Sequence, residues 1–336
     1  MKSRLLPILM AGMIALLGAC STAPAAPPPA ATQLPEPAAT SAPASESATA
    51  SETVSVTDAR GTAVTVPANP QRIVTLSELD LDAALALGLK PVGSVNGRGQ
   101  TGLPAYLNDK ADGIVSVGTL AEPSLEKIVA LQPDVILAGA MIPQIEALLP
   151  ELSKIAPVVA TYKRTDDWKT AFKQIAGMLN QSAKADAFMA DYDQRAAAVK
   201  ASLPADKPAE ANVVRWMPQG PVVMMAYTFS SRVLADAGLG RPAGLDELAG
   251  EDGAHSDPIS LEKLDLIDAE WLFWGALNPD GAAALETALK NPLVQQMNAV
   301  KNNHVAQVDG AVWTSVGGPL AAMVILDDIA NALKAE

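Results

Sequence analysis

A stretch of seventeen residues occurs twice in this chain, and it constrains the fold more than any other feature of the sequence. The first copy, SLEKIVALQPDVILAGA, covers 124–140, and the second, SLEKLDLIDAEWLFWGA, covers 260–276. They align without a gap and are identical at six of the seventeen positions. Each copy predicts a serine N-cap, a short helix, an acidic turn and a buried strand that ends in Gly-Ala. A four-letter match can arise by chance, but agreement in register over seventeen residues indicates one αβ unit in each half of the chain.

Apolar strand-like segments alternate with helical patterns around both copies, which is typical of parallel α/β units. The expected strands cover 73–76, 91–95, 135–138, 157–161, 213–217, 222–226, 271–274 and 305–308. The expected helices cover 79–87, 125–131, 142–152, 231–237, 261–267, 283–297 and 319–333. The sequence therefore predicts an α/β fold of two Rossmann-like lobes, an N-terminal lobe over 53–166 and a C-terminal lobe over 206–336.

The residues between the two halves, 167–205, predict a helical connection with a break near Asn180–Ser182. Its second part has apolar residues at spacings of three and four, at Ala185, Phe188, Met189, Tyr192, Ala196, Val199 and Leu203. A run of about twenty residues without Gly or Pro spans roughly 30 Å as a helix. We therefore expect one long rigid helix to join the lobes. An ordinary crossover helix inside a single sheet is the alternative.

The N-terminal residues predict export. Lys2 and Arg4 precede an apolar run, 5–17, that suits a secretory signal and is too short to span a membrane comfortably. We therefore interpret 1–19 as a signal peptide. The run leads into Cys20, the only cysteine, and this arrangement resembles the lipobox of bacterial lipoproteins. The resemblance implies a lipidated Cys20. An ordinary signal peptide with a stray cysteine is the alternative.

Residues 20–52 consist mostly of Ala, Pro, Ser, Thr and Glu. Such a composition cannot bury enough apolar surface to order itself, so we expect a disordered tether. The formal net charge of the chain is -13. This charge argues against binding to nucleic acid and against electrostatic adhesion to anionic lipid.

The sequence lacks several cofactor-binding, catalytic and metal-binding motifs, and it matches one other motif only weakly. The segment Gly97–Gly102 matches G-x-G-x-x-G after a predicted strand, but a poor helix start follows it and an exported protein does not normally meet NAD. We interpret it as a loop that borders a ligand cleft. The chain contains no G-x-S-x-G and no G-x-x-x-x-G-K-[ST] motif. His255 and His304 have no neighbours at metal-ligand spacing, so no protein metal site is expected.

A set of short motifs resembles the substrate-binding proteins of ABC importers for ferric siderophores and cobalamin. The motifs are TDARGT at 57–62, VTVP at 64–67, PQRIV at 70–74, ALG at 86–88, KPVG at 90–93 and SLEKIVALQPD at 124–134. The resemblance implies two α/β lobes joined by one long helix, with a ligand cleft between them, no catalytic residues and no cofactor. It implies capture of a ferric siderophore outside the membrane and delivery to a permease driven by a cytoplasmic ATPase. We expect a monomer.

The resemblance also implies site residues. Glu126 and Glu262, the glutamates of the two repeat copies, match the acidic positions that dock on arginines of the permease. A glutamate in the first turn of a helix is also favoured by the helix dipole alone. The expected ligand residues, which lie in loops after strands, are Arg98, Trp216, Tyr227, Arg232, Asn96, Tyr162, Arg164, Arg215, Trp274 and Trp313. Arginine suits the oxygens around the iron, and aromatic faces suit the organic shell of the chelate.

Two other functions remain open from the sequence. A haem or cobalamin carrier of the same fold is one, because Tyr162 or Tyr227 could supply an axial ligand to haem. An exported α/β enzyme is the other, although no nucleophile and base pair is visible in the sequence.

Overall fold

The computed structural model describes residues 52–140, 142–204, 209–251 and 253–334. The predicted signal peptide, Cys20 and nearly all of the predicted tether lie outside the described residues. Among the helices described, none is long and apolar enough to cross a membrane.

The first of two α/β sheets is parallel and has five strands in the order β5-β4-β3-β6-β7. The strands are β3 (Ile73–Thr75), β4 (Gly93–Ser94), β5 (Val115–Ser116), β6 (Val135–Leu137) and β7 (Val158–Val159). The helical segments between them are α1 (Glu78–Ala86), η1 (Ala105–Leu107), α2 (Asn108–Ala111), α3 (Leu125–Ala130) and α4 (Pro143–Ile155). An antiparallel hairpin of β1 (Thr53–Thr57) and β2 (Ala63–Pro67) precedes the sheet. We call this part the first lobe.

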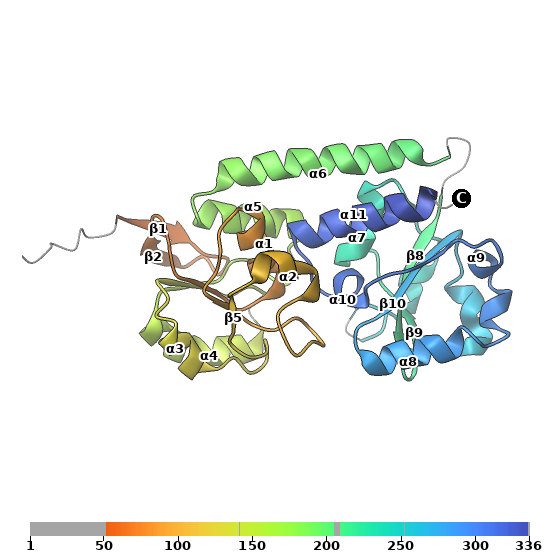
Figure 1. The fold of residues 1–336 in the computed structure, drawn as a ribbon, viewed down its shortest axis with the longest axis horizontal. Coiled ribbons are helices and arrows are strands. Elements are labelled where there is room, and N and C mark those ends of the chain that lie inside the picture. The colour runs from red at the N-terminus through yellow and green to blue at the C-terminus, as the bar shows by residue number, and fades with distance from the viewer. Residues whose placement is uncertain (1–51, 141, 205–208, 252, 335–336) are drawn as a thin grey trace, which may run out of the picture. The chain divides into compact units, whose positions relative to one another are not determined.

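The second sheet has four strands in the order β11-β10-β8-β9. The strands are β8 (Ala211–Met217), β9 (Gly220–Val223), β10 (Trp271–Ala276) and β11 (Val305–Gln307). Its helical segments are α7 (Phe229–Asp236), η2 (Leu245–Leu248), η3 (Leu261–Leu266), α8 (Pro279–Ala288), η4 (Val294–Gln296), α9 (Asn298–Lys301), α10 (Gly310–Trp313) and α11 (Pro319–Lys334). We call this part the second lobe (Figure 1). The α/β fold class with parallel strands is thus confirmed.

Strand β9 departs from the parallel pattern that the sequence predicted. It pairs antiparallel with β8, with Val214 opposite Val223. Only two residues separate the strands, and this is a hairpin length, because a parallel connection needs a dozen or more residues. The expectation of a parallel strand at this place was wrong.

The duplicated stretch occupies equivalent places in the two sheets. Strand β6 pairs in parallel with β3, which comes first along the chain among the strands of the first sheet. Strand β10 pairs in parallel with β8, which comes first along the chain among the strands of the second sheet. In both lobes the helical segment of the repeat directly precedes this strand. The repeat therefore corresponds to one αβ unit in each lobe.

The helical part of the repeat differs between the two copies. In the first copy Ser124 caps α3 and accepts a hydrogen bond from the Lys127 amide at 3.3 Å. In the second copy the segment η3 is 3₁₀-helical, leaves helical geometry at Lys263 and has no side-chain cap from Ser260. Its buried residue Leu264 and the buried cap residue Ile267 that follows the segment are three apart, which suits a 3₁₀ turn. The expectation of a capped α-helix in this copy was wrong.

The long helix expected over 283–297 is interrupted. Helix α8 ends at Ala288, and a turn leads into the short segment η4. Pro292 stands in this turn and cannot continue a helix, because it lacks an amide hydrogen and its ring clashes with the preceding turn.

Two helices, α5 (Trp168–Met178) and α6 (Ser182–Ser202), connect the lobes, and the break between them lies where the sequence predicted it. Asn180 adopts a φ of 56° at the break. The buried residues of α6 belong to the apolar stripe predicted from the sequence, at Ala185, Met189, Tyr192, Ala196 and Val199. Whether α6 acts as one rigid strut remains a prediction.

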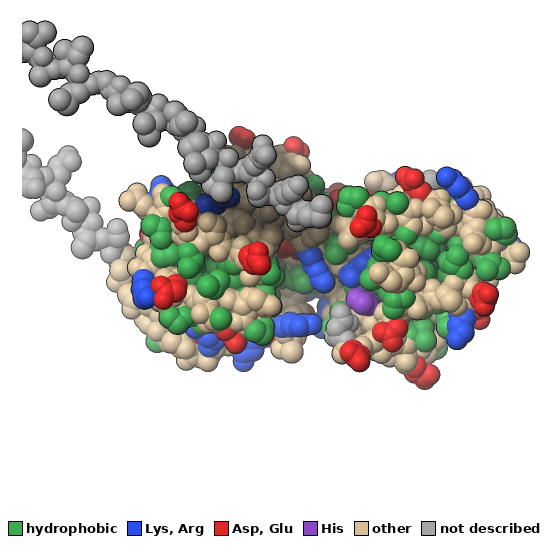
Figure 2. Space-filling model, turned by 90° about the horizontal axis from the view of Figure 1, so that it is seen from below, with side chains coloured by type: hydrophobic (Ala, Val, Ile, Leu, Met, Phe, Trp, Pro, Cys, Tyr) green, Lys and Arg blue, Asp and Glu red, His purple; other side chains and the backbone are tan. Residues whose placement is uncertain are grey.

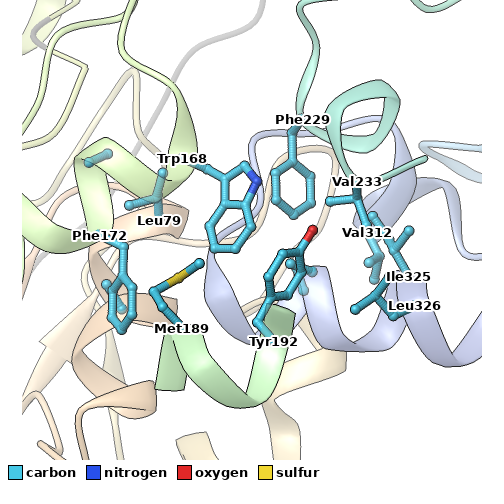
Figure 3. Close-up of a cluster of buried hydrophobic side chains, with 14 of the residues drawn as sticks. Leu79, Trp168, Phe172, Met189, Tyr192, Phe229, Val233, Val312, Ile325 and Leu326 are labelled. Carbon is cyan, nitrogen blue, oxygen red and sulfur yellow. The ribbon is translucent and has the colours of Figure 1, made fainter. Parts of the chain in front are cut away.

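Helices α1, α5, α6, α7 and α11 share one hydrophobic cluster, which contains strand residues of both lobes. Trp168 packs edge to face on Tyr192 and Phe229, with ring centroids 4.9 and 6.0 Å apart. Figure 3 shows these three side chains next to one another in the cluster. Asp236 of α7 accepts a hydrogen bond from the Tyr192 hydroxyl at 2.7 Å. It also forms an ion pair with Lys169 at 2.8 Å. The lobes therefore meet through packed helices rather than through a bare linker.

Helix α1 carries two fully buried carboxylates that tie it to distant segments. Asp80 accepts hydrogen bonds from the Ser77 and Thr161 hydroxyls at 2.7 and 2.5 Å and from the Gly139 amide at 2.7 Å. Asp82 accepts hydrogen bonds from three donors: the Leu320 amide at 2.7 Å, the Ala321 amide at 3.0 Å and the Tyr106 hydroxyl at 2.7 Å. Burial raises the pKa of each carboxyl to about 6, although these hydrogen bonds oppose the increase.

The raised pKa of Asp80 predicts a pH-dependent stability. Between about pH 4 and pH 6 the folded state binds more protons at Asp80 than the unfolded state, so this contribution is lost as the pH rises through 6. In Asp80→Asn the amide keeps an acceptor for Gly139 and removes the buried charge. The free energy of unfolding of this variant, relative to the wild type, should rise by about 2 kcal/mol from pH 4.5 to pH 7. Urea denaturation at the two pH values measures it.

The matched control is Asp109→Asn, which removes a carboxyl from an exposed position of α2. The argument would be contradicted if, from pH 4.5 to pH 7, the stability of Asp80→Asn relative to the wild type changed no more than that of Asp109→Asn.

Candidate functional site

Loops at the carboxyl ends of the strands of both sheets meet between the lobes. The loop Gly97–Gly102 follows β4, and Leu277 follows β10 of the second lobe. Gly99 has a φ of 72°, and a Cβ at this position would lie 2.9 Å from the carbonyl oxygen of Leu277. Figure 2 shows a hollow between the two halves, with Lys and Arg side chains on both sides of it. Ligands of open α/β sheets bind at this end of the strands.

A carboxylate of the first lobe reaches the second lobe at this place. The two oxygens of Glu78, the first residue of α1, accept hydrogen bonds from the Arg98 amide and, at 2.7 Å, from the Ser315 hydroxyl. Burial raises the pKa of Glu78, while both hydrogen bonds and the charge of Arg98 act in the opposite direction. Ser315 lies in the loop between α10 and α11 of the second lobe.

The wall formed by the first lobe contains three of the predicted ligand residues. The side chains of Arg98 and Arg164 are exposed, and Asn96 is half-buried. The Oδ1 atom of Asn96 accepts a hydrogen bond from the Ser116 hydroxyl at 2.5 Å. Both guanidinium groups are therefore accessible to solvent, and Asn96 is held in place by Ser116.

The wall formed by the second lobe contains Tyr227 and Arg232. The Tyr227 side chain is 54 % exposed. The Nε atom of Arg232 donates a hydrogen bond to the Tyr227 carbonyl oxygen at 2.8 Å. Asp167 caps α5, and burial acts to raise the pKa of its carboxyl. Hydrogen bonds from Thr170 and Lys169, together with the positive charge of Arg232, lower this pKa below its usual value. Arg232 therefore lies near the N-terminal end of α5.

Two further residues of the second lobe were not predicted from the sequence. His255 lies in the segment that pairs with the end of β9, where the Met225 amide donates to the Ala254 carbonyl oxygen at 3.0 Å. The same segment holds Gly253, where a Cβ would lie 3.0 Å from the Tyr227 hydroxyl. His255 lies in a loop and has no motif around it, so the contact of its segment with Tyr227, made at Gly253, leaves no signal in the sequence.

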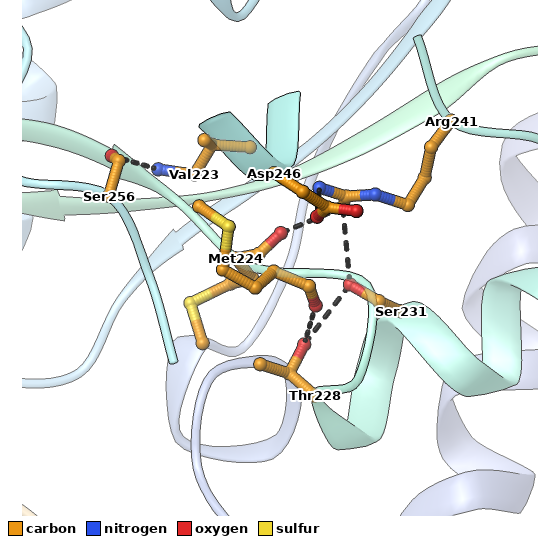
Figure 4. Close-up of polar contacts among 8 residues, drawn as sticks. Val223, Met224, Thr228, Ser231, Arg241, Asp246 and Ser256 are labelled. Carbon is orange, nitrogen blue, oxygen red and sulfur yellow. Dashed lines mark hydrogen bonds and ion pairs between the residues drawn. The ribbon is translucent and has the colours of Figure 1, made fainter. Parts of the chain in front are cut away.

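Arg241 is the second residue that the sequence did not reveal. It lines a pocket of about 460 Å³ with Ala226 and the residues 242–247. Its guanidinium donates to the Met224 carbonyl oxygen at 2.7 Å and lies 3.6 Å from Asp246, as Figure 4 shows. Burial lowers the pKa of Arg241, and the charge of Asp246 acts against this. Its sequence surroundings, a loop between Gly240 and Pro242, predict only a turn.

The other predicted ligand residues have buried side chains. Trp216 and Trp274 pack edge to face at 5.9 Å in the core of the second lobe. Trp313 stacks on Phe273 at 4.6 Å, and its Nε1 donates a hydrogen bond to Asp328 at 2.8 Å.

Tyr162 and Arg215 are buried as well. The Tyr162 hydroxyl donates a hydrogen bond to the Ser77 hydroxyl at 3.2 Å, and the Arg215 guanidinium donates to the carbonyl oxygen of Thr314. These side chains are 4 % and 6 % exposed, and those of Trp216, Trp274 and Trp313 at most 2 %. Burial of this degree leaves no free face of the five side chains for a ligand in this structure. The roles predicted for them as ligand contacts are untested.

In the described part of the chain, no group of three or more His, Cys, Asp or Glu side chains is placed so that it could hold a metal ion. The arrangement instead suits non-covalent binding, with cations and an aromatic ring on opposite walls.

Comparison with known proteins identifies the family. A model of the periplasmic binding protein family matches residues 73–312. The chain belongs to this family. The probable siderophore-binding lipoprotein YfiY of Bacillus subtilis is 32 % identical over 277 residues, which are 81 % of this chain and 85 % of that protein. The achromobactin-binding periplasmic protein of Dickeya dadantii is 31 % identical over 269 residues, 78 % of this chain and 86 % of that protein.

Solved structures support the same assignment. Staphylococcus aureus SirA in complex with staphyloferrin B has a TM-score of 0.71 and 26 % sequence identity, and the match covers 84 % of this chain and 98 % of SirA. The family and these relatives are binding proteins rather than enzymes.

The close approach at Gly99 predicts a sensitive position in this periplasmic binding protein. Gly99→Ala should lower the free energy of unfolding by about 1–2 kcal/mol, because alanine is strained at positive φ and its Cβ would press on Leu277. Gly102→Ala, in the same loop, is the matched control, since nothing lies within 4 Å of a Cβ there. Urea denaturation of both variants measures the difference, and equal losses would contradict the proposed contact.

Proposed function

We propose that this protein is an extracytoplasmic substrate-binding protein that captures a ferric siderophore and delivers it to an ABC import permease. The similarity supports this most directly, because this chain is 32 % identical to a probable siderophore-binding lipoprotein. The chain also exposes the side chains of Arg98, Arg164 and Tyr227. Guanidinium groups bind the oxygens of an iron chelate through charge-assisted hydrogen bonds, and an aromatic face packs on its organic part.

The ligand contacts that we propose are the exposed or half-buried members of the predicted set, Asn96, Arg98, Arg164, Tyr227 and Arg232. His255 is a further candidate, because its loop lies against Tyr227. The iron is cargo that arrives inside its chelator, so the protein needs no metal site of its own. A haem carrier remains the alternative to test, with Tyr227 as the exposed candidate ligand, since Tyr162 is buried.

We also propose the location and partners of the protein. It is anchored outside the cytoplasm through a lipid on Cys20, as a monomer, and it works with a permease and a cytoplasmic ATPase. The names of the relatives support an extracytoplasmic place, since YfiY is called a lipoprotein and the Dickeya dadantii protein is called periplasmic. Glu126 on α3 and Glu262 on η3 are both exposed, one on each lobe at the same place of the repeat. They are the proposed docking contacts for the permease.

Binding is tested by titrating the protein with ferric siderophores, ferric citrate, hemin and cobalamin. At least one ferric chelate should bind with a Kd below about 10 µM. A Kd of this size would already be weak for a scavenging receptor. Arg98→Ala and Arg232→Ala should each weaken this binding by about tenfold or more, through loss of a charged hydrogen-bond donor.

The control for these two variants is Arg195→Ala, at an arginine on the outer face of α6 that is half exposed and pairs with Asp191. It should leave the Kd unchanged. If no ferric chelate binds in this range, or if only hemin binds with a Soret band, the siderophore assignment is wrong.

Docking is tested with the double variant Glu126→Ala/Glu262→Ala. Transport of the ferric chelate in cells that depend on this protein should fall strongly, because both charges that face the permease are lost, while the Kd for the chelate stays the same. Replacement of two other exposed carboxylates, Glu146 and Glu286, provides the control. Unchanged transport, or a weaker Kd, would argue against a docking role.

A further inference from the structure

The carboxylate of Glu78 holds one loop from each lobe at the floor of the cleft. One oxygen accepts the Arg98 amide of the first lobe, and the other accepts the Ser315 hydroxyl of the second lobe at 2.7 Å. The two residues that it joins are 217 positions apart. Glu78 therefore links the loop that carries Arg98 to the opposite lobe, in addition to the contact of Gly99 with Leu277.

Each of the two loops makes one further contact. The backbone at Gly99 packs directly on the Leu277 carbonyl oxygen. On the other side, the buried guanidinium of Arg215 donates a hydrogen bond to the carbonyl oxygen of Thr314, the residue before Ser315. Glu78 is thus the central member of a polar chain that crosses the cleft floor from the Arg98 loop to β8.

The charge of Glu78 is unfavourable for direct contact with an anionic chelate. A carboxylate repels the carboxylate, catecholate or hydroxamate oxygens that an iron chelate presents. Both of its oxygens already accept hydrogen bonds, and its side chain is half-buried. A residue with these properties is better suited to hold other groups in position than to contact the ligand.

We propose that Glu78 is a positioning residue for chelate binding. It fixes the Arg98 loop against the second lobe, so that the Arg98 guanidinium is oriented before the chelate arrives. A loop that is already ordered in the free protein loses less conformational entropy on binding, and this raises the affinity for the chelate. The inference rests on the proposed function, because it assigns Arg98 to the ligand.

The test compares Glu78→Ala with Glu78→Gln in the full chain, by calorimetric titration with ferric citrate and with ferric staphyloferrin B. Glu78→Ala should weaken binding by about tenfold, because both loops lose their hydrogen bonds. Glu78→Gln should bind within about threefold of the wild type or more tightly. Its amide oxygen accepts from Arg98, its amide nitrogen donates to Ser315, and its neutral charge removes the repulsion.

A double-mutant cycle distinguishes positioning from a general structural role. In the Arg98→Ala background, Glu78→Ala should add little further loss, because Glu78 acts through Arg98. Glu146→Ala is the matched control, since Glu146 stands in the first turn of α4 in the same lobe and is exposed. It should leave the affinity unchanged.

Amide hydrogen exchange in the ligand-free protein is a second readout, which does not depend on the identity of the ligand. Glu78→Ala should speed exchange at the amides of Arg98 and Gly99 by about tenfold, and Glu78→Gln should not. Equal exchange in wild type and Glu78→Ala overturns the inference. Equal affinity losses in the Ala and Gln variants, or additive losses with Arg98→Ala, also overturn it. Absence of chelate binding by the wild type instead overturns the proposed function, and the exchange result then decides the positioning of the loop alone.

Discussion

The contact between Asp82 and the start of α11 is the interaction on which the arrangement of the two lobes depends. Helix α11 follows Gly317 and Gly318, which have no side chains to cap it, and Asp82 of the other lobe accepts its Leu320 and Ala321 amides. A carboxylate at a helix N-terminus is favoured by the free amides and the helix dipole, and this offsets part of the cost of its burial. A Cβ at Gly318 would lie 2.7 Å from the Asp82 carboxyl carbon, so glycine permits the approach.

This contact places the cleft as well as the lobes. Ser315 precedes α11 by four residues, and Glu78 precedes Asp82 by one helical turn, so the two hydrogen-bonded pairs lie side by side along α1. The aromatic cluster of Trp168, Tyr192 and Phe229 joins the lobes through α5, α6 and α7. Moving one lobe would break a buried carboxylate contact and open a packed core, and both changes cost several kcal/mol. We therefore expect recognition to rest on the side chains of the two walls more than on closure.

The predictions that succeeded were those that depend on local pattern. The stripe of α6, the break at Asn180 and the strands of both sheets follow from hydrophobic periodicity and from turn residues close in sequence. The predictions that failed concern backbone direction and geometry. The antiparallel pairing of β9 depends on its two-residue connection to β8. The end of α8 depends on Pro292, and the 3₁₀ form of η3 suits the spacing of the buried residues Leu264 and Ile267.

The candidate site was predicted only in part, for a physical reason. The sequence by itself determined two related αβ units, because periodicity and repetition are properties of neighbouring residues. Its prediction that the ligand residues lie in loops after strands was wrong for Arg215 and Trp216, which lie in β8, and for Trp274, which lies in β10. Only the tertiary structure decided which of these side chains are exposed: it buries Trp216, Trp274 and Trp313 and exposes Tyr227. It also brings Arg98, Glu78 and Ser315 together. Exposure depends on packing between residues far apart in the chain, and a single sequence does not contain those distances.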